Sequence, residues 1–457
     1  MAERKWDRKA GKTVTGRGGA TTGTDNQGGD RREKSHGSPG VPGESRRMGV
    51  RLFSRNFILL VLGQVSSLVG NYTLKFALSM YVLEQTGSAA VYAGLLAVAM
   101  LPTILLSPLG GILADRADRR AVMVALDAMS GLAVLAGGAA LSAGGGVISI
   151  GVLLVVLSVL GAFESPTVQA CVPQMLSGEN ILRGNAVVNQ IQALAALLTP
   201  FLGSLCYTSF GLRPVFCATA GCFLITVGLE CLIRLEYRRS ERPVGVGALI
   251  RDDLRASARF LIREEPGVFR LLLLAALLSM LVVGIIVVGT PYLVRTTLGL
   301  SAGHYALAES GMGVASVVGG ILVGLLAGRF RFHAMYRLII AVGLCLIPAG
   351  LSFLLPLEVM TRYSLLVAML CGCQLLCSVF SIFALSAIQE RTPEHLAGKV
   401  MACVSTLSLC AQPLGQILYG VLFDGLTGMA YLVLIPSGLL IVVIGVISAP
   451  LFQQQAH

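Results

Sequence analysis

Hydrophobic residues dominate the chain from residue 57 onward, in long runs separated by short polar stretches. Each run has roughly 20 residues or more, enough to cross the ~30 Å hydrocarbon core of a bilayer as an α-helix. A backbone surrounded by lipid must satisfy its own hydrogen bonds, so we expect each run to be helical. The pattern therefore predicts an all-α membrane protein with twelve spans: 57–82, 90–114, 121–143, 147–170, 185–207, 214–234, 271–294, 304–328, 337–356, 363–388, 399–423 and 429–451.

Residues 1–50 have a different character, because they are rich in Gly, Ser, Thr and charged residues and nearly free of large apolar ones. Such a segment cannot bury enough surface to fold alone, and it has no apolar core typical of a signal peptide. We predict a disordered basic tail, or alternatively an arm that lies on the anionic membrane face. The abrupt change also suggests that translation starts at Met48, which N-terminal sequencing of natively expressed protein would decide.

Charge is scarce, at 13% of residues against 55% hydrophobic, whereas soluble domains carry roughly 25% charged residues. The net charge of +11 lies in the tail and short loops, which favours a membrane surface over nucleic acid as its partner. With a cytoplasmic N-terminus, twenty-two Lys and Arg residues flank the inner side of the spans and three flank the outer side. The positive-inside rule then predicts a multi-pass cell-membrane protein with both termini cytoplasmic.

The longest polar segment divides the spans into six and six. We predict six-helix bundles over 51–234 and 271–452, joined by a cytoplasmic linker over 235–270. Within the linker, arginines recur every four residues, a spacing that predicts a basic amphipathic helix on the inner membrane surface. These arginines are Arg251, Arg255, Arg259 and Arg263.

The two halves also repeat short motifs in the same order. "GGIL" occurs at 110–113 and again at 319–322, and "TPFLGSLCY" in the fifth span matches "QPLGQILYG" in the eleventh. A pair of parallel repeats is a transporter architecture, with the substrate site near the midplane between the halves. The second motif predicts a helix kink in each half, formed by Pro200 and Gly203 and by Pro413 and Gly415.

The stretch "GGILADRADRR" at 110–120 places five charges after two glycines. It resembles the signature loop between the second and third helices of the major facilitator superfamily, which usually has Gly where this chain has Asp118. The resemblance covers about residues 55–452. Within the family, "GQVSSLVGNYTLKFALSMYVLEQTGSA" and "QPLGQILYGVLFD" resemble the branch of macrolide-efflux and enterobactin-exporter-like proteins. This resemblance to the family implies twelve helices in two pseudo-symmetric six-helix bundles.

The resemblance also implies a role for the loop. A carboxylate at Asp115 would face the N-terminal end of the eleventh helix, and the arginines would pair across the loop and with Asp127. Such a cluster would hold an inner gate shut; alternatively, the arginines only mark the cytoplasmic side. The predicted inner-gate residues are Gly111, Asp115, Arg116, Arg119, Arg120 and Asp127.

Ionisable residues inside the spans are costly and therefore candidates for function. Lys75 and Glu164 lie on helices that line the central cavity in the family, where they could bind substrate or a proton, or form a structural pair. Glu309 is either a proton carrier or a partner of Arg295 in an outer gate. Glu230 is expected to pair with Arg234. A polar patch at the start of the fifth span, which includes Asn189 and Gln190, could line the inner vestibule.

No motif for ATP hydrolysis or for metal- or serine-dependent hydrolysis occurs, and most of the cysteines lie inside apolar runs. We therefore expect no enzyme, no cofactor and no metal, and predict a monomeric secondary transporter of a small-molecule substrate. The resemblance favours a proton-coupled exporter of drugs or amphipathic molecules such as macrolides. The alternatives are a siderophore or lysolipid transporter of the same fold, or a non-transporting membrane sensor or scaffold.

Overall fold

The computed structural model describes residues 53–177, 179–235, 260–326 and 335–454. The predicted tail, and the part of the linker helix that holds Arg251, Arg255 and Arg259, lie outside the described residues. Within the described residues all regular secondary structure is helical, and twelve helices are long and apolar enough to cross a membrane. The predicted all-α class and the number of spans are confirmed.

The first half contains six long helices that alternate in direction and are joined by short turns. These are α1 (Arg55–Thr86), α2 (Ala89–Arg116), α3 (Arg119–Ser142), α4 (Gly146–Met175), α5 (Glu179–Phe210) and α6 (Leu212–Cys231).

The seventh span differs from the other spans because it changes from an ordinary α-helix into wider π-type turns. A short π-helical turn, η1 (Phe260–Glu264), precedes it, and its α-helical part starts within the predicted linker because Pro266 begins the helix. The elements of this half are α8 (Pro266–Leu278), η2 (Ser279–Val283), η3 (Ile285–Gly289), η4 (Tyr292–Thr297), α9 (Ala302–Leu326), α10 (Met335–Leu354), α11 (Val359–Arg391), α12 (Glu394–Gly425) and α13 (Ala430–Gln454).

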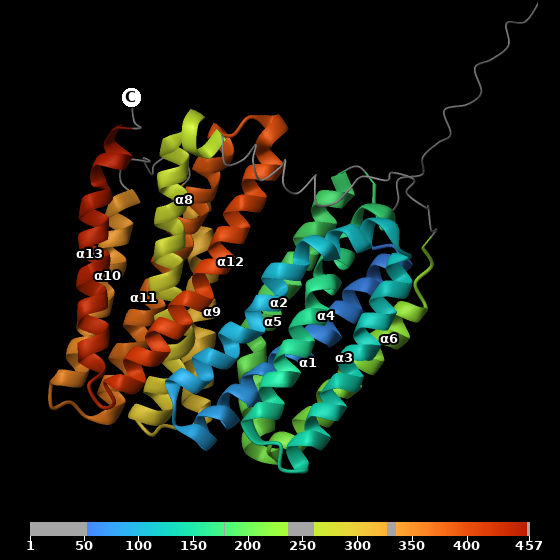
Figure 1. Ribbon diagram of the computed structural model, residues 1–457, viewed down its shortest axis with the longest axis horizontal. Helices are drawn as coiled ribbons and strands as arrows, with labels where there is room; N and C mark the ends of the chain where they lie inside the picture. The colour runs from blue at the N-terminus through green and yellow to red at the C-terminus, as the bar shows by residue number, and fades with distance from the viewer. Residues whose placement is uncertain (1–52, 178, 236–259, 327–334, 455–457) are drawn as a thin grey trace, which may run out of the picture. The chain divides into compact units, whose positions relative to one another are not determined.

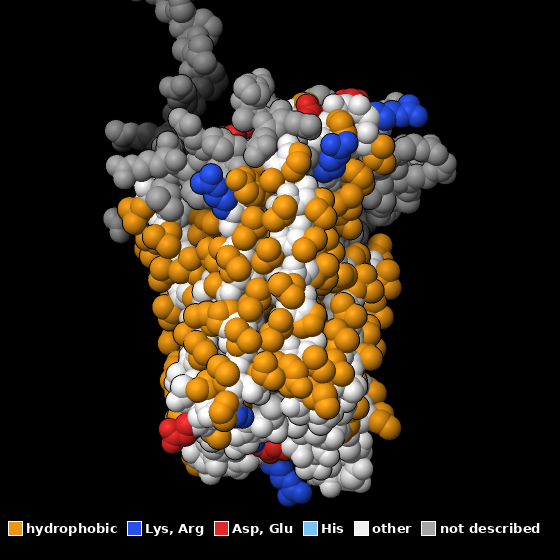
Figure 2. All heavy atoms as spheres, turned by 90° about the vertical axis from the view of Figure 1, so that its left-hand side faces the viewer, with side chains coloured by type: hydrophobic (Ala, Val, Ile, Leu, Met, Phe, Trp, Pro, Cys, Tyr) orange, Lys and Arg blue, Asp and Glu red, His pale blue; other side chains and the backbone are white. Residues whose placement is uncertain are grey.

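Figure 1 shows two groups of helices within residues 53–454, with α1–α6 in one and α8–α13 in the other. They meet chiefly along two helix pairs, α2 with α12 and α5 with α9. Figure 2 shows a broad hydrophobic band over one face of the second group, bounded by charged side chains at both ends. This band is the surface expected to face lipid. Exposed apolar residues of α10 and α13 belong to this surface: Leu344, Leu351, Leu439, Leu440, Val443, Val446 and Ile447.

The predicted repeat appears as equivalent helix contacts in the two halves. A Cβ at Gly110 of α2 would overlap the carbonyl of Ala162 in α4, and one at Gly319 of α9 would lie 2.9 Å from the carbonyl of Leu375 in α11. Glycine is therefore required where each of these helix pairs crosses most closely. The two copies of "GGIL" thus have the same role in helix packing, one in each half.

The kink motifs show the same equivalence. Gly203 of α5 packs on the side chain of Phe76 in α1, and Gly415 of α12 lies against the backbone of Met280 in the seventh span. Both prolines are buried inside their helices. Each motif therefore brings the fifth helix of its half close to the first helix of the same half.

Candidate functional site

Two adjoining cavities lie where the halves meet. The larger, of about 390 Å³, is lined mainly by α1, α2 and α4, with Val287 of η3 and two residues of α12 closing it from the other half. The smaller, of about 310 Å³, lies between α1, α2, α5, η3 and α9. Because both halves contribute walls, the position matches the predicted site between the repeats. Residues common to both cavities are Lys75, Ser79, Tyr92, Leu96 and Val287.

The walls of the larger cavity are largely aliphatic, those of the smaller cavity add aromatic side chains, and charged groups are few in both. The side chain of Lys75 is exposed to the cavities, with Nζ 5.8 Å above the ring of Tyr72, and no ion pair joins it to a described carboxylate. The hydroxyls of Ser79 and Tyr92 share a hydrogen bond of 3.2 Å. An apolar chamber with a few fixed polar groups is the usual form of a small-molecule site.

Glu309 of α9 lines the smaller cavity, as does Lys75 of α1. Its Oε2 atom is buried without a hydrogen-bond partner among the described residues. Tyr305, one turn earlier, stacks on Phe76 with ring centroids 4.9 Å apart, so the two halves also touch beside this carboxylate. The structure contradicts the predicted Glu309–Arg295 pair, because Arg295 has another partner.

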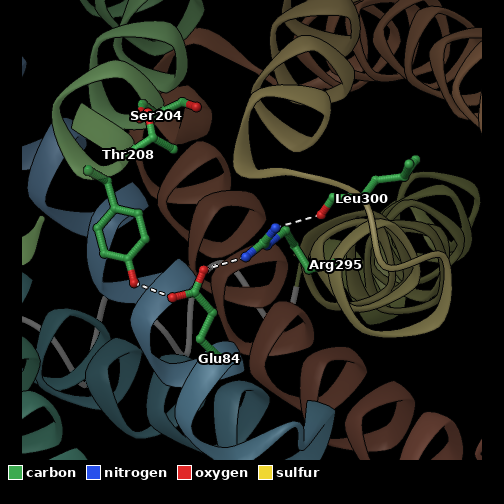
Figure 3. A network of polar contacts seen from close by, with 6 residues as sticks. Glu84, Ser204, Thr208, Arg295 and Leu300 are labelled. Atoms are coloured by element: carbon green, nitrogen blue, oxygen red, sulfur yellow. Dashed lines mark hydrogen bonds and ion pairs between the residues drawn. The ribbon is translucent and has the colours of Figure 1, made fainter.

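That partner is Glu84, near the end of α1, and Figure 3 shows the contact. Glu84 also accepts a hydrogen bond of 2.5 Å from the hydroxyl of Tyr207 in α5, while Arg295 donates one of 2.5 Å to the carbonyl of Leu300. An ion pair from α1 to η4 therefore joins the halves at the end predicted to be extracellular. Sequence analysis missed Glu84 because it follows a span and has the appearance of an ordinary loop charge.

A second contact between the halves lies at the same end. The carboxylate of Asp424, at the end of α12, accepts hydrogen bonds from the Ser88 hydroxyl and from the backbone N–H groups of Ala89 and Ala90, at 2.7 and 3.1 Å for the two amides. These amides begin α2, where the helix dipole favours an anion. We call Asp424 with the Glu84–Arg295 pair the outer latch.

The loop that carries the family signature is only partly described. Gly111, Asp115 and Arg116 lie in the last turns of α2, but their side-chain contacts lie outside the described part of the structure. Asp118 caps α3 by accepting from the Arg120 and Ala121 amides at 3.0 and 3.4 Å. Asp118, which stands where the family signature usually has Gly, is therefore the N-cap residue of α3.

The described arginines of the loop bind carbonyls of their own half. Arg119 donates to the carbonyls of Ala114 and Ala170 at 2.6 and 2.8 Å, and Arg120 donates to that of Cys231. These carbonyls lie near the ends of α2, α4 and α6, where a cation is favoured. The structure therefore differs from the prediction that these two arginines pair with Asp127.

Asp127 instead lies buried beside Glu230, at 0% and 1% exposure. The predicted Glu230–Arg234 ion pair does not form, because Glu230 faces the bundle interior while Arg234 is exposed.

Glu164 is half-buried in α4 and does not line either cavity, although Gly161 one turn earlier does. Gln190 is exposed, Pro200 lines the smaller cavity, and the side chain of Asn189 lies outside the described part.

Comparison with known proteins agrees with this architecture. The sequence profile of the Major Facilitator Superfamily matches residues 60–416. Macrolide efflux protein A of Streptococcus pyogenes is 24% identical over 402 residues, which cover 86% of this chain and 94% of that protein. The multidrug efflux pump Tap of Mycobacterium tuberculosis is 26% identical over 377 residues, covering 80% and 86% of the two chains.

Solved structures show the same fold at low sequence identity. The nucleoside transporter NupG aligns with a TM-score of 0.70 at 11% identity, covering 87% of this chain and 98% of the other. A bacterial homologue of the iron transporter ferroportin aligns with a TM-score of 0.65 at 17% identity, covering 86% and 98%. With the profile match over most of its length, the chain belongs to the Major Facilitator Superfamily of membrane transporters.

Proposed function

We propose that this transporter is a proton-coupled exporter of amphipathic small molecules such as macrolides. The observation that carries the proposal is the pair of adjoining cavities between the halves, which have largely apolar walls and hold a lysine from one half and a glutamate from the other. Such a chamber accepts varied apolar bodies and orients them through a few charges. The efflux proteins from S. pyogenes and M. tuberculosis support export as the direction.

The contacts between the halves support a rocking mechanism. The described polar contacts that cross from one half to the other all lie in the cavity region or nearer the outer latch; they include Ser310 to the Leu197 carbonyl and Gln416 to the Met100 sulfur. In this conformation the halves are held together at that end. Opening the latch while the opposite ends close would present the cavity to the other side.

Under this proposal, the positive-inside rule sets the direction, with both termini in the cytoplasm, the latch outside and the chain acting as a monomer. Cargo would enter the cavity from the cytoplasmic side and leave when the latch opens. Inward proton movement would drive the return. The inner gate would involve Asp115 and Arg116 at the end of α2.

Everted membrane vesicles test the proposal directly. Vesicles that contain the protein should accumulate radiolabelled erythromycin when their interior is acidified, and an uncoupler should abolish the accumulation. Vesicles without the protein are the control. Absence of gradient-driven accumulation for erythromycin and for a panel of other amphipathic antibiotics and dyes would refute the proposal.

One observation favours a second candidate, an exporter of anionic cargo such as a siderophore or a lysolipid. Lys75 is exposed in the cavity without a carboxylate partner among the described residues, which suits an anionic group. Secretion of such metabolites by a deletion strain, compared with its parent, separates the two candidates.

A further inference from the structure

A pair of carboxyl groups is buried in the first half, away from both cavities. Asp127 lies two turns into α3, and Glu230 is the penultimate residue of α6, a helix that packs against α3. The two helices run in opposite directions, and side chains tilt toward the start of their own helix, so these two side chains point toward each other. Both side chains are buried, at 0% and 1% exposure, and their carboxyl groups are close enough to interact electrostatically.

Among the described side chains, none donates a hydrogen bond to either carboxyl group. Both oxygens of Asp127 and the Oε2 atom of Glu230 are buried without a partner. Arg119 and Arg120 of the same half donate to backbone carbonyls at helix ends. Two carboxylates close together in an apolar site are very costly to ionise at the same time, so a proton on one of them is favoured.

One ionisable group lies between this pair and the substrate cavity. Glu164 of α4 interacts electrostatically with both members of the pair and with Lys75. Gln64 of α1 is buried next to Glu164. Among the described residues, the thiol of Cys171 is a further titratable neighbour of Glu230, and it contacts the sulfur of Met123 at 3.4 Å.

We propose that Asp127 and Glu230 together bind the coupling proton, at a site separate from the substrate cavity. Unloaded, the pair shares one proton and carries one negative charge; loaded from water, it holds two protons and is neutral. Glu164 transmits this change of charge toward Lys75, so the proton and the cargo influence each other without competing for one position. The coupling role rests on the proposed proton-driven transport, whereas proton binding by the pair can be measured without any substrate.

Infrared spectroscopy of the purified full-length protein reports protonated carboxyl groups directly. We compare the parent with Asp127→Asn and Glu230→Gln, whose amides match a protonated acid in shape, and with Glu390→Gln at an exposed carboxyl of α11 as the control. A carboxylic-acid band that titrates with pH should be lost in both pair variants and kept in the control. An unchanged titrating band in both pair variants would overturn the assignment.

Transport in proteoliposomes then tests the coupling role. Both pair variants should lose the accumulation of erythromycin that a pH gradient drives, whereas Glu390→Gln should accumulate it like the parent. Accumulation equal to that of the parent would overturn the coupling role. If the parent itself shows no pH-driven accumulation, the proposed function fails and the coupling role with it, while the infrared band still decides proton binding. Should an amide variant not insert, Asp127→Glu keeps two acids and should shift the titration rather than abolish it.

Discussion

The outer latch can be weakened by removing one carboxylate, in Asp424→Ala. The change deletes three hydrogen bonds to the first turn of α2, and Ser88 still caps that helix through its bond to the Val91 amide. Loss of a capping carboxylate or hydroxyl costs about 0.5–2 kcal/mol, and bonds to a charged group lie at the upper end. Because Asp424 is only half-buried, we expect the latched state to lose about 1–2 kcal/mol, which raises the unlatched fraction about 5- to 30-fold.

A cysteine placed at Ser79, which lines both cavities, reports this fraction. In right-side-out vesicles, a membrane-impermeant maleimide should reach it only when the latch is open, so the labelling rate should rise in proportion to the unlatched population. The matched control is Glu358→Ala. Glu358 is the N-cap residue of α11, but its carboxylate makes no capping hydrogen bond. A labelling rate for Asp424→Ala equal to that of the control would refute the reasoning.

Three further changes have defined outcomes. Lys75→Gln should lower the apparent affinity for anionic cargo about tenfold while affecting neutral cargo less, measured as KM in vesicle uptake. Glu84→Arg and Arg295→Glu should each raise external labelling of the cavity, and the double swap should restore the parental rate; failure of the swap would argue against a direct pair. Gly415→Ala should destabilise the protein by about 1–3 kcal/mol, because its Cβ would overlap backbone. Gly425→Ala, with open space around it, should leave the melting temperature in detergent unchanged.

The number of spans and the repeat could be predicted because both depend on short segments of the sequence and not on contacts between distant residues. Apolar run length decides whether a helix crosses the bilayer, and the two "GGIL" copies mark crossings where no side chain fits. The π-type turns of the seventh span were not predicted, since nothing in "SMLVVGIIVVG" differs from an ordinary apolar helix. They occur where Gly284 meets Gly415 of α12, which is a tertiary contact.

The outer latch was missed for a different reason. Ser88 and Asp424 are 336 residues apart, and each has the appearance of an ordinary loop residue. Only the packing of α2 against α12 brings the end of one helix to the start of the other. For Asp118, by contrast, a local signal existed, because aspartate before an apolar helix is a common N-cap.

The opposite charges that face the cavity have a consequence for how membrane voltage acts on transport. With Lys75 and Glu309 both ionised, these two side chains add no net charge to the empty cavity. When the empty cavity changes the side to which it opens, they therefore move no net charge through the electric field of the membrane. A monovalent cationic cargo adds one charge, and carrying it outward against an inside-negative potential costs up to about 2.3 kcal/mol per 100 mV. A neutral cargo would incur no such penalty, and a monovalent anion would be helped by the same amount. Since the exchanged proton carries one positive charge inward whatever the cargo, it is the size of the voltage dependence of the whole cycle, and not its sign, that reports the charge class of the cargo.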